Sequence, residues 1–167
     1  MLRRPRLEDA DDLLDFVGDD EVMRWVGGKV GDRESAVEHV VRWLARWEAN
    51  GVGQFSVVLN ERVIGRVGLL VWDPRSWVTS SYDKAGSKAE TELGWAIASR
   101  HWGHGYATEA AKAVRQWAYA ERGIERLISL VDPRNVRSIR VADKLGAAPE
   151  QLVSTDHGPA IVWVHPR

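Results

Sequence analysis

The glycines at positions 103 and 105 constrain this chain more than any other feature. A short apolar run, 93–98, precedes them, and a carboxylate, Glu92, flanks that run. After the glycines, small and apolar residues recur at the three- and four-residue spacing of one helix face, at Ala107, Ala110, Ala111, Val114, Trp117 and Ala118. The first amides of a helix lack internal partners, and the helix dipole favours negative charge there. A strand, a glycine turn and a helix in series therefore predict a phosphate-binding loop.

Two other glycine-rich phosphate loops are excluded by their spacing. A P-loop requires Gly-Lys followed by Ser or Thr, and no Lys-Ser or Lys-Thr pair follows Gly103 and Gly105. The dinucleotide-binding pattern requires a further glycine at position 108, where this chain has Thr108. What remains is Arg100-x-x-Gly103-x-Gly105 at the start of a helix.

This remaining pattern resembles the acyl-CoA pyrophosphate loop of the GNAT superfamily of N-acyltransferases. Three strings, Glu92-Leu-Gly-Trp-Ala-Ile, Trp102-Gly-His-Gly-Tyr-Ala-Thr-Glu-Ala-Ala and Asn135-x-x-Ser138, look like the branch that includes ribosomal-protein N-terminal acetyltransferases. The resemblance covers most of the chain but is specific only around these motifs. It implies acetyl-CoA as co-substrate and an amine as acceptor.

Size and charge fit that implication. The chain has 167 residues and a net charge of −1, which predicts one globular domain, residues 1–167. Nine Lys and Arg stand against five Asp and Glu within 100–144, a local charge of +4. A basic region of this size suits a small anionic cofactor and does not suit nucleic acid, which needs a basic stripe and a high pI.

Several other classes of protein are not expected. No apolar run approaches the roughly 18 residues that span a bilayer, so we expect a cytoplasmic protein without membrane association. The chain has no cysteine, which excludes a thiol nucleophile and disulfides. The histidines His39, His157 and His165 have no partner at metal-ligand spacing, so we expect no metal site.

The order of predicted elements defines an α+β fold with a mixed, mostly antiparallel sheet of about seven strands and about four helices. Asp9 is expected to cap the first helix, and Ser35 with Glu38 to form a capping box for the second. The expected strands are 2–7, 54–59, 62–72, 92–98, 125–131, 151–154 and 160–165, and the expected helices 8–16, 35–50, 106–118 and 135–145.

Three further expectations concern the regions between these elements. The segment from Glu21 is expected to end at Gly27-Gly28, and residues 73–90 form an aperiodic loop. Alternate residues of the third strand, from Val63 to Val71, are expected to share one face. The resemblance implies that the fourth and fifth strands run parallel and splay apart, with acyl-CoA between them.

Acylation of an amine requires its uncharged form. A lysine-type amine is neutral in about one molecule in two thousand at pH 7, and an α-amine in roughly one in seven, so a proton-accepting carboxylate is useful to both. Glu92 is the candidate general base, since it flanks the strand beside the expected thioester. The alternative is a solvated carboxylate at a strand end. Glu90, on the same face, is the second choice.

The cofactor residues follow from the resemblance. The backbone of Trp95, Ala96 and Ile97 is expected to contact pantetheine, although their side chains could simply be core. Asn135 would bond the pantetheine arm or only cap its helix, and Ser138 would donate a proton to the thiolate or only position the sulfur. The expected pyrophosphate residues are Arg100, Gly103, His104, Gly105, Tyr106, Ala107 and Thr108.

Trp25, Trp72 and Trp77 are the candidate acceptor-binding residues, because they fall in or beside expected loops; core packing is the alternative for each. The acceptor itself stays open among a protein N-terminus, a polyamine, an amino acid, an aminoglycoside and another metabolite amine. The predicted function is N-acyl transfer by direct amine attack. The alternatives are an acyl-CoA-binding module without efficient turnover and a domain without a ligand. Exposed strand or helix faces could support a homodimer.

Overall fold

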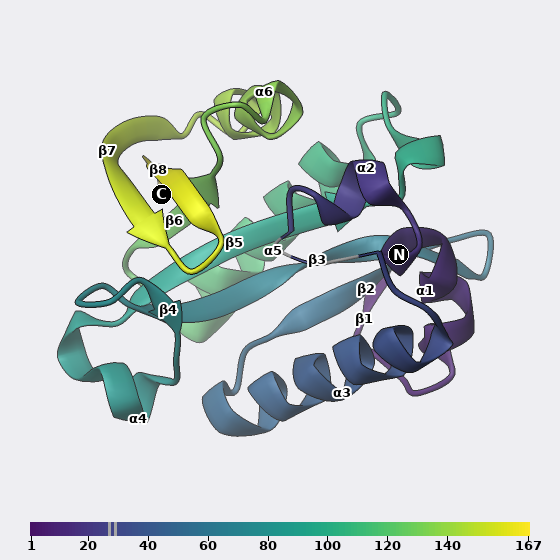
Figure 1. The fold of residues 1–167 in the computed structure, drawn as a ribbon. Coiled ribbons are helices and arrows are strands. Elements are labelled where there is room, and N and C mark those ends of the chain that lie inside the picture. Colours follow the sequence, from purple (N-terminus) through teal and green to yellow (C-terminus); the bar gives the residue numbers. More distant parts are fainter. Residues whose placement is uncertain (27, 29) are drawn as a thin grey trace.

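One eight-stranded sheet organises the part of the chain that this computed structural model describes, residues 1–26, 28 and 30–167 (Figure 1). Its strand order is β1-β2-β3-β5-β6-β8-β7, with β4 paired to β3. The strands are β1 (Leu2–Arg3), β2 (Gln54–Leu59), β3 (Arg62–Asp73), β4 (Val78–Thr79), β5 (Glu90–Ile97), β6 (Leu127–Val131), β7 (Ala148–Thr155) and β8 (Gly158–Val164). Only β5 and β6 are parallel neighbours within the described residues, so the expected mixed, mostly antiparallel sheet is confirmed.

Six α-helices accompany this sheet in the described residues, against about four expected. They are α1 (Asp9–Val17), α2 (Asp20–Met23), α3 (Arg33–Asn50), α4 (Tyr82–Ala85), α5 (Tyr106–Arg122) and α6 (Val136–Lys144). The additional ones, α2 and α4, have four residues each, too short for a helical period to show in the sequence. Gly27, half of the Gly27-Gly28 pair, lies outside the described residues.

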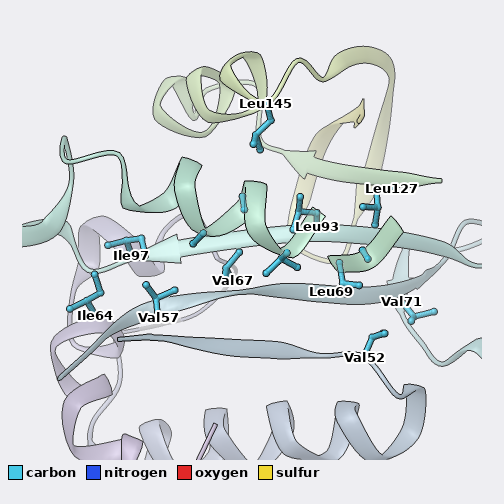
Figure 2. Packing of buried hydrophobic residues seen from close by; sticks show 14 residues of the cluster. Val52, Val57, Ile64, Val67, Leu69, Val71, Leu93, Ile97, Leu127 and Leu145 are labelled. Atoms are coloured by element: carbon cyan, nitrogen blue, oxygen red, sulfur yellow. The ribbon is translucent and has the colours of Figure 1, made fainter. Parts of the chain in front are cut away.

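Helices cover both faces of the sheet (Figure 1). On one face, α5 packs on a cluster of aliphatic side chains from the central strands. Figure 2 shows three of them, Leu69, Leu93 and Leu127, on the adjacent strands β3, β5 and β6, and each is almost fully buried. On the other face, α1, α2 and α3 pack on Val58, Val63 and Ala96. This second layer leaves part of its sheet face open, where the cavity described below lies.

The pairing between β5 and β6 stops after two residues. Thr91 is opposite Leu127 and Glu92 opposite Ile128, and beyond them the strands separate. These are the strands expected as fourth and fifth, so the predicted splay is confirmed; the short β4 moves their numbers up by one. The Ser129 hydroxyl donates to the Leu93 carbonyl at 2.6 Å and ties the two strands together where they part.

The β2–β3 hairpin has the expected bounds to within one residue. Its turn residues, Asn60 and Glu61, have φ of 48° and 67°, as a type I′ turn requires. The expectation that alternate residues of β3 share one face was wrong at Val63, which packs under α1 and α3, whereas Val67 packs under α5. A register shift opposite Val57 and Val58 causes this, because one additional residue reverses the facing of a strand.

Both predicted helix caps were wrong. Asp9 lies inside α1, and its carboxylate is buried. The N-cap of α3 is Asp32, whose side chain accepts from the Ser35 amide at 3.0 Å. Ser35 therefore belongs to the first turn of α3, and it forms no capping box with Glu38. Asp9 bonds to Ser56 of a distant strand, and Asp32 bonds to the Ser35 amide. Neither partner is evident from the position of the Asp residue in the sequence.

The segment 73–90 is not the aperiodic loop expected. It contains β4, α4 and a 3₁₀ turn at Gly86–Lys88. The Tyr82 amide donates to Asn50 Oδ1 at 3.1 Å, and the Tyr82 hydroxyl bonds Thr91 Oγ1 at 2.9 Å. The segment is thus attached to α3 and to the central strand. The first strand is shorter than expected and ends at Arg3, before Pro5.

Candidate active site

The glycine turn leaves a row of backbone amides without partners among the described residues. Gly103 and Gly105 have φ of 83° and 85°, which a residue with a Cβ rarely adopts. Gly105 is the N-cap of α5 and supplies no capping side chain. Within the described part of the chain, the amides of residues 103–108 have no acceptor, in contrast to those of His101 and Trp102. These amides at the start of a 17-residue helix form a site suited to an anion.

A cavity of about 1080 Å³ begins at this turn and runs between the splayed strands. Five of the seven predicted pyrophosphate residues line it: Gly103, Gly105, Tyr106, Ala107 and Thr108. Residues of α6 and β6 line it, as do residues of α2, α3 and β3. The cavity therefore connects the unpartnered amides with the open part of the sheet.

Two predicted pyrophosphate residues lie outside that lining. The Arg100 guanidinium forms an ion pair with Asp15 of α1 at 2.5 Å. His104 Nδ1 lies 2.9 Å from the Trp102 carbonyl oxygen, and the His104 ring stacks on Tyr106. Both residues therefore hold the loop in shape rather than face the cavity.

Arg137 is near this turn; the sequence offers it, with Arg134 and Arg140, either as a partner of the cofactor's 3′-phosphate or as part of a solvated helix face. It lies on α6 and lines the cavity, with its guanidinium carbon 4.4 Å from the centre of the Trp102 ring. Its proximity arises from the packing of α6 beside the glycine turn, which the spacing of the three arginines does not show.

Glu92 is the third residue of β5 and is buried, so the alternative of a solvated carboxylate at a strand end does not apply. The indole Nε1 of Trp72 donates to Glu92 Oε2 at 2.6 Å. Burial raises the pKa of Glu92 above its ordinary value, and the bonds from Trp72 and the charge of Arg66 reduce that rise without cancelling it. A carboxylate with a raised pKa that lines a cavity is a stronger base than an exposed one.

Glu90, the second choice for the base, lies elsewhere. Its carboxylate pairs with Arg126 of the neighbouring strand region at 3.1 Å. Glu90 does not line the large cavity, whereas Glu92 does. The geometry therefore separates two carboxylates that the sequence places on the same strand face.

The three residues expected beside pantetheine, Trp95, Ala96 and Ile97, all line the cavity. Ser129 donates to the Leu93 carbonyl, so that carbonyl faces β6. The backbone groups of Trp95, two residues further along β5, point to the same side, where β6 no longer pairs with β5. The side chains of Ala96 and Ile97 are also buried in the hydrophobic core, so the core packing that was the alternative for them is present as well.

Asn135 and Ser138 both line the cavity at the start of α6. Asn135 caps this helix, because its Oδ1 accepts from the Ser138 amide at 3.1 Å. Among the described residues, the Ser138 hydroxyl has no hydrogen-bond partner. The capping role that was weighed for Asn135 is present, and the Ser138 hydroxyl remains free to bond a ligand.

The three candidate acceptor tryptophans have different surroundings. Trp25 and Trp72 line the cavity, and Trp72 lies within β3 rather than in a loop. Trp77 is not part of that lining; it follows β3 with φ of 52°. Within the described residues no group of three or more His, Asp or Glu could hold a metal ion. No described helix is long and apolar enough to cross a membrane.

Two arginines that sequence reasoning did not select line the cavity near Glu92. Arg66 comes from β3 and Arg46 from α3, and the charge of each acts on the Glu92 carboxyl. They are 20 positions apart and meet only through the packing of α3 on the sheet. The signal available in the sequence was His39-x-x-Arg42-Trp43-x-x-Arg46, in which polar residues recur at helical spacing along one face of the helix expected at 35–50.

Comparison with known proteins supports one family. Residues 1–148 match the acetyltransferase (GNAT) domain family. The chain is 40% identical over 72 residues to the uncharacterized protein YkkB of Bacillus subtilis, a match that covers 43% of this chain and 42% of YkkB. This alignment therefore spans less than half the length of that relative.

Solved structures have the same fold. An acetyltransferase from Agrobacterium tumefaciens is 27% identical, with a TM-score of 0.78 over 99% of this chain and 90% of its own. The aminoglycoside acetyltransferase AAC(6′)-Ib in complex with ribostamycin and coenzyme A is 18% identical, with a TM-score of 0.79 over 100% and 93%. A proposed ribosomal-protein-serine acetyltransferase from Vibrio cholerae is 21% identical, with a TM-score of 0.75 over 99% and 92%. The last two show likeness of fold alone, whereas the domain match over residues 1–148 decides the family: this chain belongs to the GNAT acetyltransferases.

Proposed function

We propose that this chain transfers a short acyl group, acetyl in the simplest case, from acyl-CoA to a primary amine by direct attack in a ternary complex. One observation carries the proposal: the unpartnered amides of residues 103–108 open onto the same cavity as the buried carboxylate of Glu92. Family membership is consistent with it. A structure of the same fold holds coenzyme A together with an amine-bearing ligand, ribostamycin.

The proposed binding mode follows the cavity from end to end. The amides of 103–108 take the pyrophosphate, aided by the dipole of α5. The pantetheine arm lies between β5 and β6, along the backbone of Trp95 and beside Asn135. This places the thioester near the side of β5 that carries Glu92. The acceptor enters from the side that α3 and β3 line.

The proposed reaction forms one bond and breaks one. The neutral amine attacks the thioester carbonyl, a C–N bond forms, and the C–S bond breaks when the tetrahedral intermediate collapses. Glu92 takes the proton that the amine loses, directly or through water. The departing thiolate gains a proton to become the free thiol, and Ser138 is the hydroxyl proposed to bond that sulfur. Backbone amides of β5 beyond the splay would stabilise the oxyanion.

The test is an assay of thiol release from acetyl-CoA with a broad panel of primary amines, followed by mass spectrometry of the products formed from isotope-labelled acetyl-CoA. Release that depends on the amine, with label in the acylated product, is the expected result. A rise in the unfolding temperature with acetyl-CoA but no turnover across the panel would favour a binding module instead. No rise at millimolar acetyl-CoA would contradict binding itself, because a ligand of the native state must stabilise it.

A further inference from the structure

The acceptor end of the cavity has an arginine-rich wall. Helix α3 presents His39, Arg42, Trp43 and Arg46 to it, at spacings of three, four and seven residues, which is one helix face. Burial, with a contribution from nearby arginines, lowers the pKa of His39 to about 4, so that ring is neutral at pH 7. The charge on this wall therefore comes from the arginines.

Arg42 and Arg46 differ in their partners. Arg42 has an ion-pair partner one turn away, Glu38, at 3.6 Å. Arg46 has neither a hydrogen bond nor an ion pair with any described residue. It is nevertheless partly buried, and burial lowers its pKa although the charge of Glu92 opposes that effect. A partly buried guanidinium without a partner is costly to keep unless something binds it.

Arg66 reaches the same end of the cavity from β3. Its Nη1 donates to Gln54 Oε1 at 3.0 Å, and Gln54 is fully buried. Gln54 Nε2 has no hydrogen-bond partner among the described residues. The Gln54 side chain therefore orients the arginine through its oxygen, while its own N–H groups stay without an acceptor within those residues. Burial lowers the pKa of Arg66 to about 10, against the opposing charge of Glu92. No described carboxylate forms an ion pair with Arg66 within 4.0 Å.

The base and this cation border one small space. A Cβ built on Gly94 would lie 3.4 Å from Glu92 Oε1 and 3.5 Å from Arg66 Nη1. An amine that reaches Glu92 is therefore within a few ångströms of a guanidinium. Because like charges repel strongly where water is excluded, an ammonium alone is poorly accommodated there.

Charge balance identifies what the acceptor should carry. Two guanidiniums, Arg46 and Arg66, face one carboxylate, Glu92, which leaves an excess of +1 when all three are ionised. We infer, on the basis of the proposed function, that the acceptor is an amine with a carboxylate a few bonds away, and that Arg46 and Arg66 bind this carboxylate while Glu92 receives the amine. One negative charge offsets the excess, and the planar guanidinium fork matches a carboxylate.

This charge balance disfavours other classes of amine. A polyamine or an aminoglycoside would add several positive charges beside Arg46 and Arg66. A phosphate dianion carries two negative charges, which is more than the excess of +1 that remains while Glu92 is ionised. The cavity lining also includes Trp25, Trp43 and Trp72, which suit an apolar remainder. An α-amino acid with a hydrophobic or aromatic side chain has all of these features.

The experiment compares matched acceptors. Each hydrophobic and aromatic L-amino acid is assayed with acetyl-CoA beside its own amide and its decarboxylated amine, for example L-tryptophan, L-tryptophanamide and tryptamine. We expect kcat/KM to be about 10- to 100-fold higher for the carboxylate-bearing member, as for loss of a charge-assisted hydrogen bond. R46M should remove most of that preference, chiefly through KM, and R46K should restore part of it. R33M, on the same helix but paired with Asp11 outside the cavity, should leave the preference intact.

The unfolding temperature separates recognition from a structural role. R46M should unfold at the same or a higher temperature, because it removes a cation that has no partner in the part of the chain that the structure describes. Equal or faster turnover of the amides and decarboxylated amines, with no effect of R46M, would overturn this inference and leave N-acetyl transfer intact. No turnover of any amine would instead overturn the proposed function, so the two failures are distinguishable.

Discussion

The indole Nε1 of Trp72 donates to Glu92 Oε2 at 2.6 Å, across the antiparallel pair β3–β5. This bond fixes the carboxylate in a buried position and favours its ionised form. Burial acts in the opposite direction and is the stronger effect, so the pKa of Glu92 is raised overall. A residue expected to contact the acceptor is therefore a partner of the expected base.

Removing this donor should change the pH dependence of the reaction. In W72F the hydrogen bond to the charged carboxylate is lost, so the pKa of Glu92 rises further. We expect the acid limb of the kcat/KM profile to move to higher pH, with lower activity at pH 7 that recovers as the pH is raised. W77F is the matched control, since Trp77 does not line the cavity. An unmoved limb would show that another group controls the profile.

Replacing the proposed base, Glu92, should separate activity from stability. E92Q should lower kcat by about 100-fold or more, the usual contribution of a general base. Because the folded-state pKa of Glu92 is raised, its ionisation costs stability as the pH rises through that pKa. E92Q should therefore be the more stable protein at pH 7, and the difference should shrink near pH 4.5, where the unfolded carboxyl is also becoming protonated.

The control for that experiment is E90Q. Glu90 pairs with Arg126 outside the cavity, so its loss should leave kcat almost unchanged. Urea unfolding and amine-dependent thiol release measure the two effects. If E92Q retained full kcat, Glu92 would not be the base; if E90Q alone lost activity, the second choice would become the first.

Much of the fold was predictable because its signals are local. The Asn60-Glu61 turn, the glycines at 103 and 105 and the helix that follows are each encoded within a few residues. The α2 and α4 helices were missed because four residues show no period. The predicted face of Val63 was wrong because a single bulge, which the sequence does not show, reverses the alternation of side chains along β3.

The site was predictable only in part, and for the same reason. The glycine turn and Glu92 lie on one continuous stretch, so the sequence places them near each other. Arg46 and Arg66 reach Glu92 from α3 and β3, through packing that no spacing reveals. Arg100 was assigned to the pyrophosphate from its motif, yet an acidic residue 85 positions earlier, Asp15, pairs with it.

Gly94 leaves space beside Glu92 and Arg66, and filling it should lower activity without harming the fold. In G94A the new methyl would lie at ordinary contact distances from Glu92 and Arg66, so no backbone need move. Because small misplacements of reacting groups cost rate steeply, we expect kcat/KM for the amine to fall about 10-fold or more. Stability should stay within about 1 kcal/mol of the wild type. The thermal shift with coenzyme A should be unchanged; a reduced shift would place the defect at the cofactor instead.

Gly105 should matter for its backbone conformation. A Cβ there would meet no atom within 4 Å, but φ is 85°, so G105A carries strain rather than a clash. Adopting this conformation costs a residue with a Cβ about 1–2 kcal/mol. We expect weaker binding of coenzyme A, measured by calorimetry, because the amides of 103–108 would no longer hold their arrangement. Equal affinity in G105A and wild type would contradict the role of this turn.

Asp9 tests stability at a distance from the cavity. Its buried carboxylate accepts from Arg3 at 2.8 and 2.5 Å, from the Arg6 amide at 3.0 Å and from Ser56 Oγ at 2.7 Å. Burial alone would raise the pKa of Asp9, but these bonds outweigh it and lower the pKa. D9N should therefore cost about 3 kcal/mol of unfolding free energy at pH 7, as for breaking a buried pair.

The pH dependence of that loss identifies its origin. A depressed folded-state pKa stabilises the protein above the unfolded pKa, about 3.9, and this contribution disappears as the pH falls through the lower folded value. The gap between wild type and D9N should thus be constant from pH 7 to pH 5 and close below pH 4 in urea titrations. D11N, which alters the exposed pair with Arg33, should cost no more than about 1 kcal/mol. A gap that persisted unchanged in acid would mean that lost packing, not the ionised carboxylate, destabilises D9N.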